Sequence, residues 1–500
     1  MPQVLICNVP KLEPFYLPPS LPILKGGCNF LGVDSLAIDL NIDFINTCVA
    51  RDIKYNEQVV KVTESSIPNN EFKNVVHELL SKWAVELTDR NPELIAISVF
   101  STSSQYFARE LCVEIKKLNS NIKIIIGGQG ITDSITTGPR FAKKLQENSI
   151  IDYYLEGDSE VAWPKFLATF FNLKITDRDI STDNYLNISY FPDFSDFNIS
   201  QYESHRTTDG FLYFPVTGSR GCVRNCTFCE IPTAWKFVQK SAENIRNEIA
   251  NAITVADRLH IHFTDSLVNG SLKEFNKILD HLIDLQSVNK FHWGGQYIIR
   301  PGKVEDWNKI AKSGCRLLEI GIETGSNSLR YEMDKRFKNE DLIHALEMME
   351  QHGISCVLLM FCGYPTETLE QFNETLDFFK LIQPYANTSV RAVQLNYSFC
   401  VFEDTPLYNG REAIELKLTT DPAQWTCGIN PELTYQERTR RRLITQEHLE
   451  NLGFRLGSDV KEALLALVPN YMRFRNGKEY TFDQMVLEVL GRPTTIKNKY

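Results

Sequence analysis

The chain of 500 residues contains no apolar run long enough to cross a membrane. A spanning helix needs roughly 18 uncharged apolar residues, and no stretch of this sequence reaches that length. The first residues, MPQVLICNVP, also lack the basic start, the apolar centre and the small-residue cleavage site of a signal peptide. Internal repeats and low-complexity tracts are missing as well. We therefore expect a cytoplasmic protein made of ordinary globular domains.

An excess of positive charge is absent too. The chain has 53 Lys and Arg against 63 Asp and Glu, which gives a net charge of −10. This balance argues against a broad basic face for nucleic acid, so the expected substrate is a small molecule or a peptide. The apolar content of 43% and the charged content of 23% are typical of a soluble globular protein.

The chain has 12 cysteines but not the dense spacing of a secreted disulfide scaffold. Most of them are isolated in apolar surroundings and are predicted to be small buried hydrophobic residues. These isolated cysteines are Cys7, Cys28, Cys48, Cys112, Cys315, Cys356, Cys362, Cys400 and Cys427. Only the other three, Cys222, Cys226 and Cys229, form a cluster.

Strands and helices alternate over residues 1–172. The helices are predicted from apolar residues at helical spacing, over 72–87 and 106–117. The strands are predicted from short apolar runs, at 4–9, 35–39, 94–100, 122–126 and 150–155. This pattern predicts an α/β fold with a doubly wound, Rossmann-like parallel sheet covered by helices. Such sheets bind ligands at the carboxyl ends of their strands, where Gly127, Gly128 and Gly157 fall.

The rest of the chain is predicted to contain a connection, a second α/β domain and a tail. Residues 173–212 are polar and have little periodicity, which is typical of an ordered connection. Residues 213–410 show six β/α steps and predict a partial parallel barrel with its reacting groups at the carboxyl ends of the strands. Residues 411–500 are mostly helical in pattern, and their basic patch, Arg438 to Arg442, is predicted to be a solvated helix face.

The cysteine cluster directly follows the first strand of the predicted barrel. Gaps of three and two residues allow Cys222, Cys226 and Cys229 to reach three corners of one iron–sulfur cube. Such clusters usually have four thiolate ligands, but the next cysteine is Cys315, so one iron would stay open. A zinc site or a structural cluster is the alternative. Zinc sites usually combine two Cys-x-x-Cys pairs, and no second pair stands nearby.

The spacing Cys-x-x-x-Cys-x-x-Cys, with the aromatic Phe228 before the last cysteine, resembles the signature of the radical S-adenosylmethionine (SAM) superfamily. The resemblance implies a [4Fe-4S] cluster whose open iron binds SAM. Reduction of the cluster in that family cleaves SAM to a 5′-deoxyadenosyl radical, which abstracts a hydrogen atom from the substrate. It also implies an electron donor such as flavodoxin or ferredoxin.

Later segments resemble the other barrel strands of the same family. The resemblance implies that Phe228, Asp265, Arg300 and Glu323 contact SAM; Asp265 ends the second strand, Arg300 follows the third, and Glu323 lies in Ile320-Gly321-Ile322-Glu323-Thr324-Gly325-Ser326. The usual Gly-Gly-Glu pattern is absent before Asp265. The turn Gly363-Tyr364-Pro365-Thr366-Glu367-Thr368 resembles the one after the fifth strand, with Thr366 in place of the common glycine.

A doubly wound domain before such a barrel is similar to the cobalamin-binding subgroup of the superfamily, which includes class B methyltransferases. The resemblance implies corrinoid contacts at Ser98, Thr102, Gly127, Gly128 and Gly157. The chain departs from this pattern after its first strand, where Asn8-Val9-Pro10-Lys11 replaces the Asp-x-His-x-x-Gly loop that supplies a histidine to cobalt. Cobalamin is therefore expected with its lower face uncoordinated.

The leading functional hypothesis is cobalamin-dependent methylation of an unactivated carbon. A second hypothesis is a radical SAM cyclase or rearrangement enzyme whose N-terminal domain holds no corrinoid or transfers no methyl group. A third, from another class, is a non-enzymatic iron–sulfur or corrinoid sensor. The sensor hypothesis predicts a fourth protein ligand on the cluster and no cleavage of SAM. The substrate itself cannot be predicted from these residues.

Overall fold

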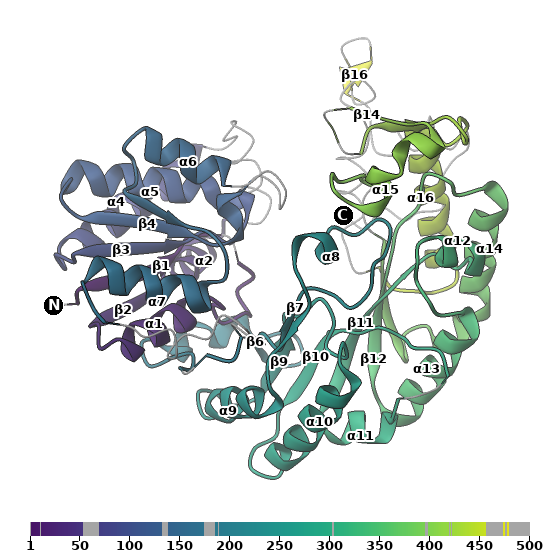
Figure 1. Ribbon diagram of the computed structural model, residues 1–500, viewed down its shortest axis with the longest axis horizontal. Coiled ribbons are helices and arrows are strands. Elements are labelled where there is room, and N and C mark those ends of the chain that lie inside the picture. The colour runs from purple at the N-terminus through teal and green to yellow at the C-terminus, as the bar shows by residue number, and fades with distance from the viewer. Residues whose placement is uncertain are drawn as a thin grey trace. The chain divides into compact units, whose positions relative to one another are not determined.

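The computed structural model describes most of the chain in two compact units (Figure 1). The described residues are 2–10, 12–53, 70–132, 139–174, 186–188, 190–302, 305–395, 399–419, 421, 423–456, 474–475 and 478–479. The first unit consists of Met1–Gly218, Val238–His262 and Asn289–Phe291, and the second of the rest. Among the described residues, no helix combines the length and the apolarity that a membrane crossing requires.

The sheet of the first unit has the strand order β2-β1-β3-β4-β5. Its strands are β1 (Val4–Asn8), β2 (Ser35–Asp39), β3 (Leu94–Ser98), β4 (Lys123–Gly127) and β5 (Tyr153–Leu155). Each neighbouring pair is parallel. The predicted doubly wound fold is therefore confirmed. The order reverses between β1 and β3, so the carboxyl ends of these strands flank the switch point at which this fold class binds ligands.

Helices cover both faces of this sheet because its strands are apolar on both sides. Leu5, Cys7 and Ile95 pack in one core with α2, α4, α5 and α6, whereas Val4 and Ile6 pack in another with α1 and α7. These helices are α1 (Leu21–Phe30), α2 (Leu40–Ala50), α4 (Asn70–Thr88), α5 (Gln105–Leu118), α6 (Arg140–Glu147) and α7 (Ser159–Phe170). The same unit includes β6 (Leu212–Val216), α9 (Ala242–Ala252) and most of β9 (Leu259–Phe263).

The second sheet has six strands in the order β13-β12-β11-β10-β9-β6, which confirms the predicted partial barrel. Its strands in the second unit are β10 (His292–Gln296), β11 (Cys315–Glu323), β12 (Ser355–Met360) and β13 (Val390–Leu395), and each pairs in parallel with the next. Helices follow the strands and line the outer side of the curved sheet (Figure 1). They are α10 (Leu272–Gln286), α11 (Trp307–Lys312), α12 (Asn327–Glu332), α13 (Asn339–His352) and α14 (Leu369–Leu381).

The described part of the C-terminal region contains a hairpin as well as helices. The hairpin joins β14 (Leu416–Leu418) to β15 (Trp425–Cys427) in antiparallel register. The helices are α15 (Pro406–Asn409), just before this region, and α16 (Tyr435–Asn451), and β16 (Phe474–Arg475) with β17 (Lys478–Glu479) forms a further pair. The prediction of a mostly helical region thus holds for α16, but it did not include the two antiparallel strand pairs.

The prediction of a solvated basic patch on α16 is wrong. Arg438, Arg441 and Arg442 are 1%, 4% and 2% exposed. Arg438 lies over the Trp425 ring at 3.6 Å and donates to the Leu433 and Ala423 carbonyl oxygens at 2.8 and 2.9 Å. Burial lowers the pKa of Arg438 to about 10, so the guanidinium stays charged at neutral pH. Charge alone predicted solvation, but an arginine can be buried where carbonyl oxygens accept from it.

We expect Arg438→Ala to destabilise the second unit by about 2–4 kcal/mol, because the buried carbonyl oxygens lose a charged donor. Arg440→Ala on the same helix is the matched control. Arg440 is half exposed and lies 3.5 Å from Glu437, so its loss costs less than about 0.5 kcal/mol. Urea unfolding of both variants measures the difference. Equal stability of the two variants would contradict a structural role for Arg438.

Candidate functional site

The cysteine loop begins with a residue that must be glycine. It runs from β7 (Ser219–Arg220) to α8 (Ile231–Ala234). Gly221 has φ of +72°, and a Cβ there would lie 2.7 Å from the carbonyl oxygens of Trp235 and Lys236. A side chain at this position meets rigid backbone in a conformation that glycine alone adopts easily. Gly221 thus lets the chain turn directly before Cys222 while it lies close to the Trp235 and Lys236 backbone.

Thr227, between the second and third cysteines, is held at three points. Its backbone nitrogen donates to the Met333 oxygen at 3.2 Å, and its carbonyl accepts from the Leu407 nitrogen at 2.8 Å. Its hydroxyl lies 2.9 Å from the Tyr364 hydroxyl. The three contacts come from the segment after α12, from α15 and from the turn after β12. The loop is therefore fixed by the barrel around it.

The three cysteines line one cavity of about 560 Å³ within the second unit. Burial raises the pKa of all three thiols, that of Cys226 to about 11, while the charge of Lys335 acts in the opposite direction on each. Within the described part of the chain, no group of three or more His, Cys, Asp or Glu is arranged around a single metal ion. A cubane does not need such a group, because its thiolate ligands bind different iron atoms. The donor set and the cavity thus fit an iron–sulfur cluster.

Glu323 enters the same cavity from the carboxyl end of β11. Its backbone is in the left-handed region with φ of +61°, and its carboxylate pairs with the Lys335 ammonium at 2.6 Å. The same ammonium donates to the Gly321 carbonyl oxygen at 2.6 Å. A Cβ at Gly321 would collide with this pair, 2.7 Å from the Lys335 nitrogen. Glycine at 321 therefore makes room for the ion pair.

A fully buried arginine closes the turn that follows Glu323. Arg330 is 0% exposed and donates to the carbonyl oxygens of Ile322 and Thr324. Its other nitrogen donates to the side-chain oxygens of Asn327 and Asn339 at 3.0 and 2.9 Å. These bonds satisfy carbonyl groups that the irregular end of β11 leaves without ladder partners. Arg330 thereby supports the unusual backbone conformation at Glu323.

The other predicted SAM contacts differ in position. Asp265 lines the cavity, is buried, and accepts from the Ser219 hydroxyl at 2.9 Å, which ties the start of the cysteine loop to the end of β9. Phe228 also lines the cavity and packs edge-on against Phe361 at 5.2 Å. Arg300 is not among the described residues that line the cavity, and its guanidinium donates to the Gly270 carbonyl oxygen at 3.1 Å. The structure therefore brings three of the four residues together.

Several cavity residues escaped the sequence analysis. Lys335 follows a helix, 12 residues after its partner Glu323, and Gln296 and Glu319 lie within strands. Alternation along β11 was the available signal, because residues 319, 321 and 323 must share one face. Cys400, which was predicted to be buried and inert, is only partly buried and also lines the cavity. The other isolated cysteines are buried as predicted.

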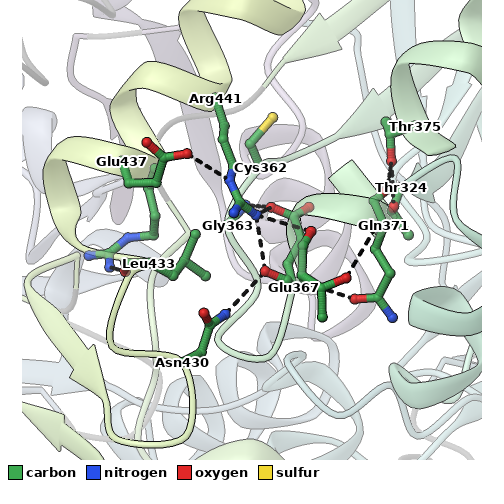
Figure 2. Close-up of polar contacts among 12 residues, drawn as sticks. Thr324, Cys362, Gly363, Glu367, Gln371, Thr375, Asn430, Leu433, Glu437 and Arg441 are labelled. Atoms are coloured by element: carbon green, nitrogen blue, oxygen red, sulfur yellow. Dashed lines mark hydrogen bonds and ion pairs between the residues drawn. The ribbon is translucent and has the colours of Figure 1, made fainter. Parts of the chain in front are cut away.

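A buried ion pair joins α16 to the turn after β12 (Figure 2). The Glu367 carboxylate accepts from the Gly363 backbone nitrogen at 3.1 Å and from Arg441 at 3.0 Å. Arg441 also donates to the Glu367 carbonyl oxygen at 3.0 Å and to Glu437 at 3.2 Å. Burial raises the pKa of Glu367 and Arg441 opposes that shift. The pair fixes the turn that presents the Tyr364 hydroxyl to Thr227.

The predicted corrinoid contacts lie at the strand ends of the first unit. The Ser98 hydroxyl is bonded to the Ser20 hydroxyl at 2.7 Å. Gly128, with φ of +99°, is packed against the Val99 carbonyl oxygen, 2.6 Å from where a Cβ would lie. Gly127 ends β4, and Thr102 is exposed at the start of the short turn Thr102–Ser104. Gly157, with φ of +83°, has no described residue other than its chain neighbours within 4 Å of its missing Cβ, so among the described residues open space lies beside it.

We expect the Thr227–Tyr364 hydrogen bond to contribute about 1 kcal/mol to the stability of the second unit. Thr227→Val and Tyr364→Phe each remove one hydroxyl and keep the shape of the side chain. A double-mutant cycle measured by urea unfolding isolates the bond from the other effects of each change. A coupling energy near zero would mean that the loop is held without this bond.

Comparison with known proteins identifies the domain that carries this cavity. Residues 216–379 match the family model of the radical SAM superfamily, so the chain contains a radical SAM domain. The chain is also 27% identical over 294 residues to tRNA-2-methylthio-N(6)-dimethylallyladenosine synthase from Aquifex aeolicus. That match covers 56% of this chain and spans 58% of the relative's length.

Two solved structures share the fold over most of the chain. The radical SAM methyltransferase TsrM from Kitasatospora setae, with cobalamin and a [4Fe-4S] cluster bound, matches 84% of this chain and 78% of its own at a TM-score of 0.57 and 16% identity. The cobalamin-dependent SAM radical enzyme OxsB, with aqua-cobalamin bound, matches 90% of this chain and 67% of its own at a TM-score of 0.60 and 15% identity. Both likenesses show that the chain shares its α/β fold with these proteins.

Proposed function

We propose that this chain, which carries a radical SAM domain at residues 216–379, is a radical SAM enzyme. Cys222, Cys226 and Cys229 would hold a [4Fe-4S] cluster with one iron left for SAM. The bound and reduced cluster supplies the electron that cleaves SAM to a 5′-deoxyadenosyl radical. The observation that carries the proposal is that the three thiols face the same cavity as Asp265 and Glu323.

The chain's own residues would bind and shield SAM in this cavity. Glu323, neutralised by Lys335, would accept hydrogen bonds from SAM, and Asp265 would face its methionine part. Phe228, Phe361 and Phe399 would form an apolar wall that keeps water from the radical. Arg300, the residue after the cavity-lining Ile299, would be a further SAM contact at the edge of the site.

We further propose that the reaction is cobalamin-dependent methylation of an unactivated carbon of a small molecule or peptide. TsrM and OxsB, which share the fold, have structures with cobalamin bound. Cobalamin supplies methyl transfer when it is bound. Thr102, Gly127 and Gly157 would contact it, because Gly157 leaves open space beside β5. Ser98 and Gly128 would lie at the edge of the cobalamin site, since both already make contacts within the unit.

The second candidate is a radical SAM reaction without methyl transfer, such as a cyclisation or rearrangement. The internal contacts of Ser98 and Gly128 favour it, because they explain these residues without a ligand. Either reaction needs an external electron donor, for which flavodoxin or ferredoxin is the class we propose. In methyl transfer, S-adenosylhomocysteine accompanies 5′-deoxyadenosine; in the second candidate, deoxyadenosine is formed alone.

We expect Cys222→Ala, Cys226→Ala and Cys229→Ala each to lower SAM cleavage below about 10% of the unaltered protein, because each removes a cluster ligand. Cys315→Ala is the matched control, since its thiol is buried in the barrel core and away from the cavity. The test is anaerobic reconstitution with iron, sulfide and hydroxocobalamin, followed by visible spectra, iron analysis and an assay for deoxyadenosine. Zinc in place of iron, or SAM left intact after reduction, would overturn the proposal.

A further inference from the structure

The middle of β11 places a second glutamate, Glu319, in the cavity, two residues before Gly321 and four before Glu323. Glu319, Gly321 and Glu323 all line the cavity, whereas Leu318, Ile320 and Ile322 are 0% exposed on the opposite face. Alternate residues of a strand point to opposite sides of a sheet. The Glu319 side chain is therefore directed into the cavity rather than toward the helices.

Glu319 has no counterion among the residues that the structure describes. Its carboxyl makes no hydrogen bond or ion pair there, and burial raises its pKa without an opposing charge. Glu319 is half-buried, whereas the two buried glutamates of the cavity and its border are paired, Glu323 with Lys335 and Glu367 with Arg441. Because a charged carboxylate is costly to bury without a partner, such a group is unusual in a folded protein.

The cations that line the cavity do not supply the missing charge. Lys335 is committed to Glu323, and Arg336 pairs with Asp334 at 2.9 Å. Arg224 is half-buried on the cysteine loop, lines the cavity, and forms no ion pair with Glu319 within the described residues. Because no cation among the described residues pairs with Glu319, a cationic group of a ligand would meet an unpaired carboxylate there.

A second polar side chain stands beside Glu319. Gln296, the last residue of β10, is its direct partner in the parallel register, and both line the cavity. Gln296 likewise makes no side-chain hydrogen bond within the described residues. A carboxylate and an amide oxygen side by side accept hydrogen bonds from a donor with several N–H groups. Part of the remaining wall, which includes Leu359, Phe361 and Phe402, is apolar.

We infer that Glu319 and Gln296 bind a protonated amine of the substrate, whose apolar part lies against the aromatic wall. The ammonium group supplies the three donors and the positive charge that this corner of the cavity lacks. A neutral or anionic group in the same place would leave the carboxylate unneutralised. The inference adds a substrate class to the proposed function, but the binding step itself needs no cleavage of SAM.

The test uses benzylamine and its neutral isostere benzyl alcohol as probes, titrated into the reconstituted protein and followed by ligand-observed NMR. We expect benzylamine to bind about tenfold more tightly than benzyl alcohol, because a charged hydrogen-bonded pair forms only with the amine. Glu319→Gln keeps the shape and removes the charge, so it should abolish this preference. Glu350→Gln, on the exposed face of α13, is the matched control and should retain it.

Equal binding of the two probes to the unaltered protein, or a preference that survives in Glu319→Gln, would overturn the inference. The affinity for SAM distinguishes a substrate site from the remaining alternative, in which Glu319 contacts SAM. If Glu319 served SAM, Glu319→Gln would weaken SAM binding about as much as amine binding, whereas a substrate site predicts a change in SAM affinity below about twofold. A preparation that binds benzylamine selectively but leaves SAM intact would refute the radical mechanism and retain the amine site.

Discussion

The fixed position of the cysteine loop is the constraint on which the second unit depends. Three thiols that serve one cluster must hold their spacing while the loop carries no regular secondary structure between β7 and α8. The barrel supplies that rigidity through Thr227, which is bonded to the segment after α12, to α15 and to Tyr364. Gly221 fixes the entry to the loop, because only glycine fits beneath the Trp235 and Lys236 carbonyl oxygens. The centre of the loop is therefore positioned by elements that follow it by about a hundred residues or more in sequence.

Buried arginines connect the C-terminal region to the turns that hold the cysteine loop in place. Arg441 fixes the turn that holds Tyr364 through Glu367, and Arg438 fixes the hairpin whose Trp425 packs in the same core as Tyr364. Arg330 does the same for the end of β11. Each of these side chains bonds carbonyl oxygens at irregular turns, where no ladder partner exists. Removing the C-terminal helix would thus disturb the cavity, although α16 contributes no residue to its lining.

The succession of strands along the chain could be predicted for both sheets because it depends on periodicity and length, which are local properties. In the first sheet, β2 has the predicted bounds, and the other strands differ by a few residues at their ends. Helices α1, α2, α6 and α7 were not predicted. For α1 the reason is that Gly26 and Gly27 weaken helical propensity. Tertiary packing requires them: a Cβ at Gly27 would lie 2.9 Å from Trp163, and one at Gly26 would collide with the Phe191 carbonyl oxygen. The roles of Lys335 and the buried arginines were not predicted either, because only folding brings their partners next to them.

The electrostatics of the cavity connect these features to the proposed chemistry. Glu323 is neutralised within the chain by Lys335, so it can accept hydrogen bonds without attracting a second cation strongly. Glu319, four residues earlier on the same strand, keeps an uncompensated charge when ionised. In a region of low dielectric, two carboxylates with such different partners attract different ligands. On the proposed function, the neutralised end by the cysteines would suit SAM, whose amino and carboxyl groups would bind the cluster. The uncompensated position would then select the molecule that the radical attacks.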